Sequence, residues 1–183
     1  MAEFRLVALG WSSTGTHKSG ARGRARIERS QMARSVRNID IASHRTSFRL
    51  EQQFWDGMTH CAKERGMTIH ELATEVVSQH RGSEATMTSA IRVFLIGYFQ
   101  NFAMMVQEPT KQIRSNMELF GRRTSFSLEA GVWNALTEMS RKHEQSIDEV
   151  CETIISNAEP GVSMASAIRI SVLLHFMERS KST

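Results

Sequence analysis

The chain has 183 residues, a hydrophobic content of 40% and a formal net charge of +4. None of its apolar runs approaches the roughly eighteen residues that a membrane-spanning helix needs, so we expect a soluble protein with no membrane partner. The positive charge is concentrated at one end: residues 1–44 carry eight Lys and Arg against three Asp and Glu, whereas residues 45–183 carry fifteen against sixteen. A polyanion would therefore meet the N-terminal arm or a few well-placed cations of the folded part.

Residues 1–34 are predicted to form a disordered basic arm, because HKSGARGRARIERS (17–30) is rich in Gly, Ser and Arg. An apolar patch at the very start precedes the positive residues instead of following them, which argues against a secretory signal. Met32 is an alternative start. The arm either follows DNA phosphates or reflects composition alone, and the sequence leaves both open.

The rest of the chain is an internal duplication. HRTSFRLEQQFW (44–55) returns as RRTSFSLEAGVW (122–133), an offset of 78 residues, and MTSAIR (87–92) returns as MASAIR (164–169) after one deleted residue. Repetition at a fixed period indicates a repeated structural unit. We expect repeat 1 at residues 35–106, a linker at 107–113 and repeat 2 at 114–180.

Each repeat opens with an alternating pattern that predicts a half-buried strand. Thr46, Phe48 and Leu50 fall in one phase, and Arg45, Ser47 and Arg49 fall in the other. Repeat 2 places Thr124, Phe126 and Leu128 in the core phase and Arg123, Ser125 and Ser127 in the outer phase. Upstream, NIDI (38–41) and NMEL (116–119) form either a second short extended segment or an ordered arm.

Two helices are predicted next. Apolar residues at three- and four-residue spacing, with Trp55 and Trp133 as packing residues, mark a first helix from about residue 51 to 65 and its copy. A capping box at Thr68 to Glu71, and again at Ser146 to Glu149, marks the start of a second helix. The free amides and positive dipole of such a start suit a phosphate oxygen.

A third helix closes each repeat and is apolar on nearly every side, so we expect it to be buried between repeats or between chains. Arg92 and Arg169 are its solitary charges. They either touch phosphate or form buried ion pairs, with Glu51 and Glu129 as possible partners. Cys61 and Cys151 do not occupy equivalent positions and are expected to be buried thiols in a reducing compartment.

A single strand leaves its ladder N–H and C=O groups unpaired, so each strand needs a partner. We expect TSFRL (46–50) to pair with TSFSL (124–128) in one two-stranded antiparallel ribbon. The fold is then mainly α, an intrachain pseudo-dimer of two strand-helix-helix repeats, each with an extra C-terminal apolar helix. In this pairing Arg49 faces Ser127 across a pseudo-twofold axis, which predicts an imperfect palindrome as the preferred DNA site.

These motifs resemble the ribbon-helix-helix repressors of the Arc and Met type. HRTSFRLEQQFW, RGMTIHEL and MTSAIRVF are most similar to a bacterial subfamily that reads R-T-S-x-x-L-E-x-x-F-W and later S-S-A-x-R. The resemblance covers about residues 36–102 and 114–178. Members are usually single repeats that dimerise, so the duplication departs from the family in oligomeric state.

The resemblance implies a sequence-specific regulator of transcription, a repressor, that inserts its ribbon into the major groove of double-stranded DNA. That groove admits a two-stranded β-ribbon, and Arg can bridge two guanine acceptors there. The expected base contacts are Arg45, Ser47, Arg49, Arg123, Ser125 and Ser127. The expected phosphate contacts are Thr68, Ser146, His44 and Arg122. A bacterial, cytoplasmic and nucleoid-associated protein follows, and its apolar third helices offer a surface for further self-association.

The competing hypothesis is a protein–protein interaction module, such as an antitoxin-like binder with a vestigial DNA-binding face. It predicts ribbon arginines neutralised by carboxylates and an exposed apolar patch near Phe94, Phe99 and Phe102. Catalysis has no support, because the chain lacks an HxxxH, a CxxC, a phosphate loop and a nucleophile elbow. We therefore expect no enzyme, no cofactor and no metal; a metal-sensing cluster of His60, Cys61 and His70 is the remaining alternative.

Overall fold

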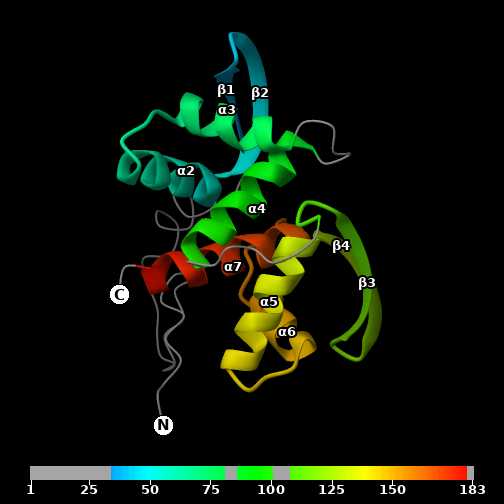
Figure 1. Ribbon diagram of the computed structural model, residues 1–183. Helices are drawn as coiled ribbons and strands as arrows, with labels where there is room; N and C mark the ends of the chain where they lie inside the picture. Colours follow the sequence, from blue (N-terminus) through cyan, green and yellow to red (C-terminus); the bar gives the residue numbers. More distant parts are fainter. Residues whose placement is uncertain (1–33, 81–85, 101–107, 181–183) are drawn as a thin grey trace, which may run out of the picture.

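The computed structural model describes residues 34–80, 86–100 and 108–180. The predicted basic arm therefore lies, up to residue 33, outside the described residues. The fold is mainly helical, with two antiparallel β-ribbons, each followed by helices, in tandem (Figure 1).

Repeat 1 contains two strands and three helices in the order that the duplication predicts. Its elements are β1 (Arg34–Ile41), β2 (His44–Glu51), α2 (Gln52–Glu64), α3 (Ile69–Gln79) and α4 (Met87–Gln100). Repeat 2 copies this order. Its elements are β3 (Gln112–Leu119), β4 (Arg122–Glu129), α5 (Ala130–Lys142), α6 (Ile147–Ser156) and α7 (Met164–Ser180).

The strand pairing differs from the prediction. TSFRL does not lie beside TSFSL: β2 pairs with β1, and β4 pairs with β3, so each repeat closes its own hairpin. We call β1–β2 ribbon 1 and β3–β4 ribbon 2. The upstream segments NIDI and NMEL are thus true strands and supply the missing partners.

The two-residue turns explain why pairing is local. Ala42 and Ser43 have φ of 46° and 71°, and Phe120 and Gly121 have φ of 53° and 69°. Positive φ at both central residues is the geometry of the tight hairpin turn whose twist matches that of the strands. Closing so short a loop costs far less chain entropy than joining strands 78 residues apart, so the hairpin forms in preference to the predicted long-range pairing.

The alternation of β2 and β4 places their apolar phase inward, as predicted. Phe48 and Leu50 are buried, and so are Phe126 and Leu128. Trp55 and Trp133 pack beside them and donate their indole N–H groups to the carbonyls of Ser35, at 3.4 Å, and Ile113, at 3.0 Å. The tryptophans therefore join the first helix of each repeat to the neighbouring strand.

The first helices end in the same way despite different residues. Gly66 has φ of 67°, and Glu144, its equivalent in repeat 2, has φ of 53°. The left-handed region is open to Gly without cost but is strained for residues with a side chain. Both copies then enter the predicted capping boxes, which Thr68 and Ser146 form with Glu71 and Glu149.

The third helices α4 and α7 pack against each other between the two repeats (Figure 1). Buried residues on each include Ile91, Leu95, Ile168 and Leu173. The prediction that these helices are buried between elements is confirmed. Their apolar surface is covered within the chain, so self-association through them stays a prediction.

Buried ion pairs join the third helices to the ribbons, as predicted. Arg92 donates to the Glu51 carboxylate at 3.1 Å and 3.0 Å, and Arg169 donates to Glu129 at 2.7 Å. Both glutamates are 0% exposed and both arginines are 7% exposed. Such burial argues against the alternative that these arginines touch phosphate.

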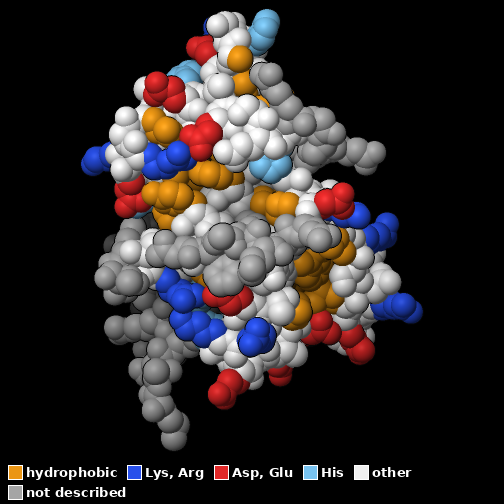
Figure 2. All heavy atoms as spheres, in the orientation of Figure 1, with side chains coloured by type: hydrophobic (Ala, Val, Ile, Leu, Met, Phe, Trp, Pro, Cys, Tyr) orange, Lys and Arg blue, Asp and Glu red, His pale blue; other side chains and the backbone are white. Residues whose placement is uncertain are grey.

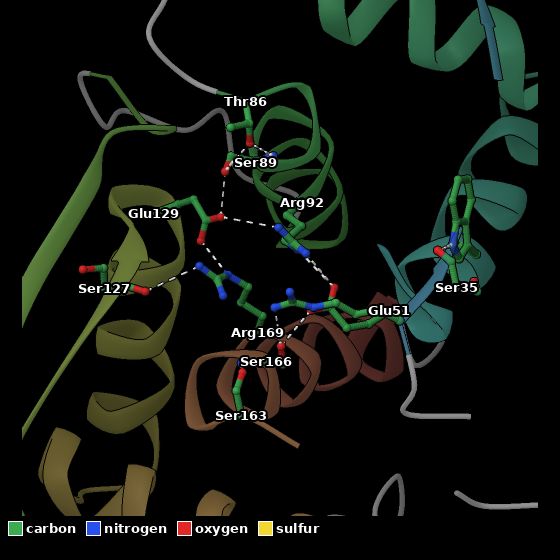
Figure 3. Close-up of polar contacts among 12 residues, drawn as sticks. Ser35, Glu51, Thr86, Ser89, Arg92, Ser127, Glu129, Ser163, Ser166 and Arg169 are labelled. Carbon is green, nitrogen blue, oxygen red and sulfur yellow. Dashed lines mark hydrogen bonds and ion pairs between the residues drawn. The ribbon is translucent and has the colours of Figure 1, made fainter. Parts of the chain in front are cut away.

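The same carboxylates also receive a serine hydroxyl from the opposite repeat (Figure 3). Ser166 of α7 donates to Glu51 at 2.9 Å, and Ser89 of α4 donates to Glu129 at 3.0 Å. We call Glu51, Glu129 and their arginine and serine donors the buried polar network. Because its contacts are reciprocal, the base of each ribbon is fixed to both third helices.

Burial raises the pKa of Glu51, but the charge of Arg92 and hydrogen bonds from Arg92 and Ser166 outweigh it, so the pKa lies below its ordinary value. The carboxylate is therefore ionised at neutral pH. Since the side chain is committed to this network, Glu51 begins α2 without a side-chain cap.

Candidate nucleic-acid interface

The outer phase of each ribbon carries the predicted base contacts. Directly opposed residues of antiparallel strands share one face, so the register defines which side chains stand together. On ribbon 1 the opposed pairs are Arg49 with Val36, Ser47 with Asn38, and Arg45 with Asp40. On ribbon 2 they are Ser127 with Arg114, Ser125 with Asn116, and Arg123 with Glu118. We call these two sets the outer faces.

The predicted meeting of Arg49 and Ser127 is wrong. Arg49 faces Val36, and Ser127 faces Arg114, because the hairpins close within each repeat. Each outer face therefore has two arginines of its own. The predicted single ribbon would instead have combined the arginines of both repeats on one face. The imperfect palindrome inferred from a shared ribbon loses its structural basis.

Hydrogen bonds order the centre of each outer face. Ser47 donates to the Asn38 side-chain oxygen at 2.7 Å, which directs the two N–H donors of that amide away from the pair. On ribbon 2, Arg114 donates to the Ser125 hydroxyl at 2.8 Å. The two faces thus carry the same pair, Ser opposite Asn, at their centres, but with different hydrogen-bond partners.

The ribbon arginines are exposed and make no close ion pair in the described part of the chain, although Arg45 stands opposite Asp40 and Arg123 opposite Glu118. Arg45, Arg49 and Arg123 are exposed, and none makes an ion pair within 4.0 Å with any residue that the structure describes. Figure 2 shows Lys and Arg side chains along the outer side of ribbon 2, with hydrophobic side chains where this ribbon meets α5. Unpaired surface cations are what a polyanion requires.

The ribbon tips are tied to the second helices. The Asp40 N–H donates to His70 Nδ1 at 2.9 Å, and the Phe120 N–H donates to the Glu152 carboxylate at 2.6 Å. Because Nδ1 accepts the amide proton, the 3.7 Å approach of Asp40 Oδ2 to the same atom is not an ion pair in this arrangement. Each ribbon is therefore held at its base and at its tip.

The predicted phosphate contacts at the helix starts are occupied from within. The Thr68 N–H donates to the Glu71 carboxylate at 2.7 Å, and the Ser146 N–H donates to Glu149 at 2.7 Å. These hydrogen bonds hold the pKa of Glu71 and Glu149 below its ordinary value, so both carboxylates are charged at neutral pH. A phosphate at either start would meet a negative charge, which weakens Thr68 and Ser146 as candidates.

His44 and Arg122, the other predicted phosphate contacts, begin β2 and β4 beside the hairpin turns. Both are exposed, and their cross-strand partners are Ile41 and Leu119. They stand at the ribbon tips, outside the two outer faces. Both share the strand phase of the buried Phe48 and Phe126, so a phosphate contact of either residue stays a prediction.

Three possible hydrogen-bond donors to DNA on the outer faces are not among the sequence predictions, and neither are the carboxylates of Asp40 and Glu118. Asn38, Asn116 and Arg114 belong to β1 and β3, which the sequence marks only as short extended segments. The recurrence of NIDI and NMEL at the 78-residue offset is the signal for the two asparagines, whereas Arg114 lies upstream of NMEL. Asn can bridge two adenine groups in the major groove, so these positions add to the candidate contacts.

The features that the competing hypothesis requires are weakly represented. Phe99 is 3% exposed, Phe94 is half-buried, and Phe102 lies outside the described residues. The large exposed hydrophobic side chains of the described chain are distributed over several elements. They are Val36, Met87, Ile113, Phe120 and Met164.

The thiols and histidines do not form a recognisable reactive centre. Cys61 and Cys151 are free and buried, and burial raises the pKa of Cys61 to about 11 and that of Cys151 to about 12. Over the described ranges, no group of three or more His, Cys, Asp or Glu is arranged to hold a metal ion. Within the same ranges, no helix has the length and apolar character needed to cross a membrane.

Comparison with known proteins gives one family and one solved structure. The model of the ribbon-helix-helix domain matches residues 34–99 and again residues 112–176. A solved structure, that of an uncharacterized protein from Bordetella pertussis Tohama I, is similar at 30% identity with a TM-score of 0.34. The match covers 44% of this chain and 68% of that one. No curated protein matches the chain significantly.

Proposed function

Because the chain belongs to the ribbon-helix-helix domain family, a family of DNA-binding regulators, we propose that it represses transcription by inserting its ribbons into the major groove of double-stranded DNA. The observation that carries this proposal is the chemistry of the outer faces. Each has two arginines and further Ser or Asn side chains, on a two-stranded element of the width that the major groove admits.

The proposed base contacts are the predicted ones, Arg45, Ser47, Arg49, Arg123, Ser125 and Ser127, with Arg114 and the two asparagines added. Arg can bridge guanine O6 and N7, and Ser can contact several bases. His44 and Arg122 would contact phosphates, while Thr68 and Ser146 would do so only by yielding one amide from their capping boxes. Phosphate contacts fix the register of a protein on DNA without reading its sequence.

The two repeats would act as a pseudo-dimer within one chain. The reciprocal contacts of the buried polar network support this, since Ser89 and Ser166 each bind the carboxylate of the other repeat. Repression would follow from occupying an operator in the bacterial cytoplasm, at the nucleoid. We propose neither a catalytic role nor a cofactor.

The interaction-module hypothesis is the less favoured one. This hypothesis requires arginines that are neutralised by carboxylates. Among the described residues, Arg45, Arg49 and Arg123 form no ion pair within 4.0 Å. It also requires an apolar patch around Phe99, which is buried.

Selection of genomic DNA fragments at two salt concentrations tests the proposal. The unmodified chain should enrich particular sequences, and the triple variant Arg45→Ala, Arg49→Ala, Arg123→Ala should lose that preference. Affinity should also depend less steeply on salt in this variant, because fewer counterions are released.

A charge-matched control removes three exposed cations outside the ribbons, Lys63→Ala, Arg141→Ala and Lys142→Ala. It should keep the sequence preference of the unmodified chain. An equal loss of preference in both triple variants, or none in either, would contradict base reading by the ribbons.

A further inference from the structure

The outer faces belong to two separate ribbons. Each hairpin is a complete two-stranded sheet, and the two sheets share no strand. In Figure 1 ribbon 1 and ribbon 2 project from different sides of the packed helices α4 and α7. One major groove admits one two-stranded ribbon, so two ribbons require two groove segments.

The two faces also differ in chemistry at matched register. At the base, ribbon 1 has Arg49 on β2 opposite Val36, whereas ribbon 2 has Arg114 on β3 opposite Ser127. The arginine therefore stands on the opposite strand of the hairpin. Val36 is 62% exposed, and an apolar side chain at this place suits the methyl group of thymine.

The centres of the faces both carry Ser opposite Asn, but the hydrogen bonds there differ. Asn38 is held by Ser47, which leaves the Asn38 amide N–H groups available to a base acceptor. On ribbon 2, Arg114 holds Ser125 in place of the asparagine. The exchange of the arginine between strands at the base, together with these different hydrogen bonds, places the donors of the two faces differently, so the faces should prefer different bases.

The two ribbons are also fixed relative to each other. Glu51 ends β2 and Glu129 ends β4, and Arg92 of α4 approaches both carboxylates, at 3.0 Å and 3.9 Å. The ribbon tips are held by His70 and Glu152. Little freedom remains for the distance between the outer faces to vary.

We propose that a single chain reads two non-identical DNA half-sites, one with each ribbon, at a fixed spacing. This proposal rests on the proposed function, since it assigns the DNA that the outer faces would recognise. It adds that the two half-sites are separate in the DNA and that each is read by the ribbon of one repeat.

Selection from random-sequence DNA with the full chain tests it, using two matched double variants. Arg45→Ala with Arg49→Ala should remove the base preference of one half-site, and Arg114→Ala with Arg123→Ala should remove that of the other. Each lost bidentate contact should reduce discrimination roughly 5- to 150-fold at its own base pair.

A second pair of variants guards against general loss of charge or of folding. Arg49→Lys and Arg114→Lys retain the charge but lose the planar two-donor geometry of Arg. Each should relax one base position of its own half-site while the salt dependence of binding stays unchanged. Circular dichroism should show the helical content of the unmodified chain in all four variants.

Moving the half-sites apart tests the fixed spacing. Inserting about five base pairs rotates one half-site to the opposite side of the duplex, which should reduce affinity to that of a single half-site. Two separate blocks of preference, each removed by one double variant, would support the proposal.

A chain that enriches no sequence at all would overturn the proposed function itself. DNA binding at one continuous site, or a site whose same bases are affected by both double variants, would overturn the half-site proposal alone. Tolerance of every spacing would do the same.

Discussion

At the residue scale, the duplication supplies its own comparisons. Gly66 and Glu144 occupy the same left-handed position after the first helix of each repeat, with φ of 67° and 53°. A side chain at this conformation costs roughly 1–2 kcal/mol, which Gly avoids. Repeat 2 therefore retains a strained residue where repeat 1 has none.

We expect Glu144→Gly to raise the free energy of unfolding by about 1 kcal/mol, because it relieves that strain at an exposed position. Chemical denaturation monitored by circular dichroism measures the change. The reciprocal variant, Gly66→Ala, should lower the stability by a similar amount. A stabilising effect of Gly66→Ala would contradict the account.

At the element scale, local signals predict most of the structure. The capping boxes at Thr68 and Ser146 are predicted and present, because they need only four neighbouring residues. The partners of Arg92 and Arg169 are also predicted, since a solitary charge in an apolar helix must be paired to be buried. Each of these inferences depends on one short pattern and one physical requirement.

The strand pairing could not be predicted in the same way. Ala42 and Ser43 form a tight turn without the Asn or Gly that usually occupies one. The sequence therefore carries no turn signal for the hairpin of repeat 1. The apolar and polar residues of β1 and β3 alternate only weakly. The outer-face residues of these two strands, including Arg114, are therefore not predictable from the pattern. The arginines of β2 and β4 are predictable because their strands also carry a clear apolar phase.

The buried polar network gives the prediction that belongs to this scale. Arg169→Met should lower the free energy of unfolding by about 3–5 kcal/mol, because it leaves the Glu129 carboxylate buried with reduced compensation. Thermal and urea denaturation measure the loss.

The double variant Arg169→Met with Glu129→Leu is the control. Removing both charges should restore much of the stability, since a buried ion pair can often be replaced by apolar side chains at little cost. A loss below about 1 kcal/mol for Arg169→Met alone would show that the carboxylate is compensated by other groups.

At the scale of the whole molecule, the two repeats are stabilised as one body by α4 and α7. His175 lies on α7 with its ring 5.4 Å from that of His143, which caps the C-terminal end of α5. Burial, then the neighbouring His143 and Arg179, lowers the pKa of His175 to about 4. The folded chain therefore keeps this imidazole neutral under conditions where an unfolded chain would protonate it.

Stability should consequently fall as the pH is lowered from about 6.5 towards 4. In that range the unfolded state binds a proton that the folded state does not, and the loss between about pH 7.5 and pH 5 should be about 2 kcal/mol. His175→Gln removes the titration and should flatten this part of the curve. Urea denaturation at each pH measures the free energy of unfolding of the unmodified chain and of His175→Gln. Equal slopes of this free energy against pH would contradict the assignment of the titration to His175.

The hairpin turns have an evolutionary consequence. Since every ladder hydrogen bond of a ribbon is made within its own repeat, a substitution on one outer face leaves the backbone pairing of the other intact. A shared ribbon would force both copies to change together. Self-contained hairpins let the outer face of each copy change independently, so a duplication can give one chain two surfaces of different specificity.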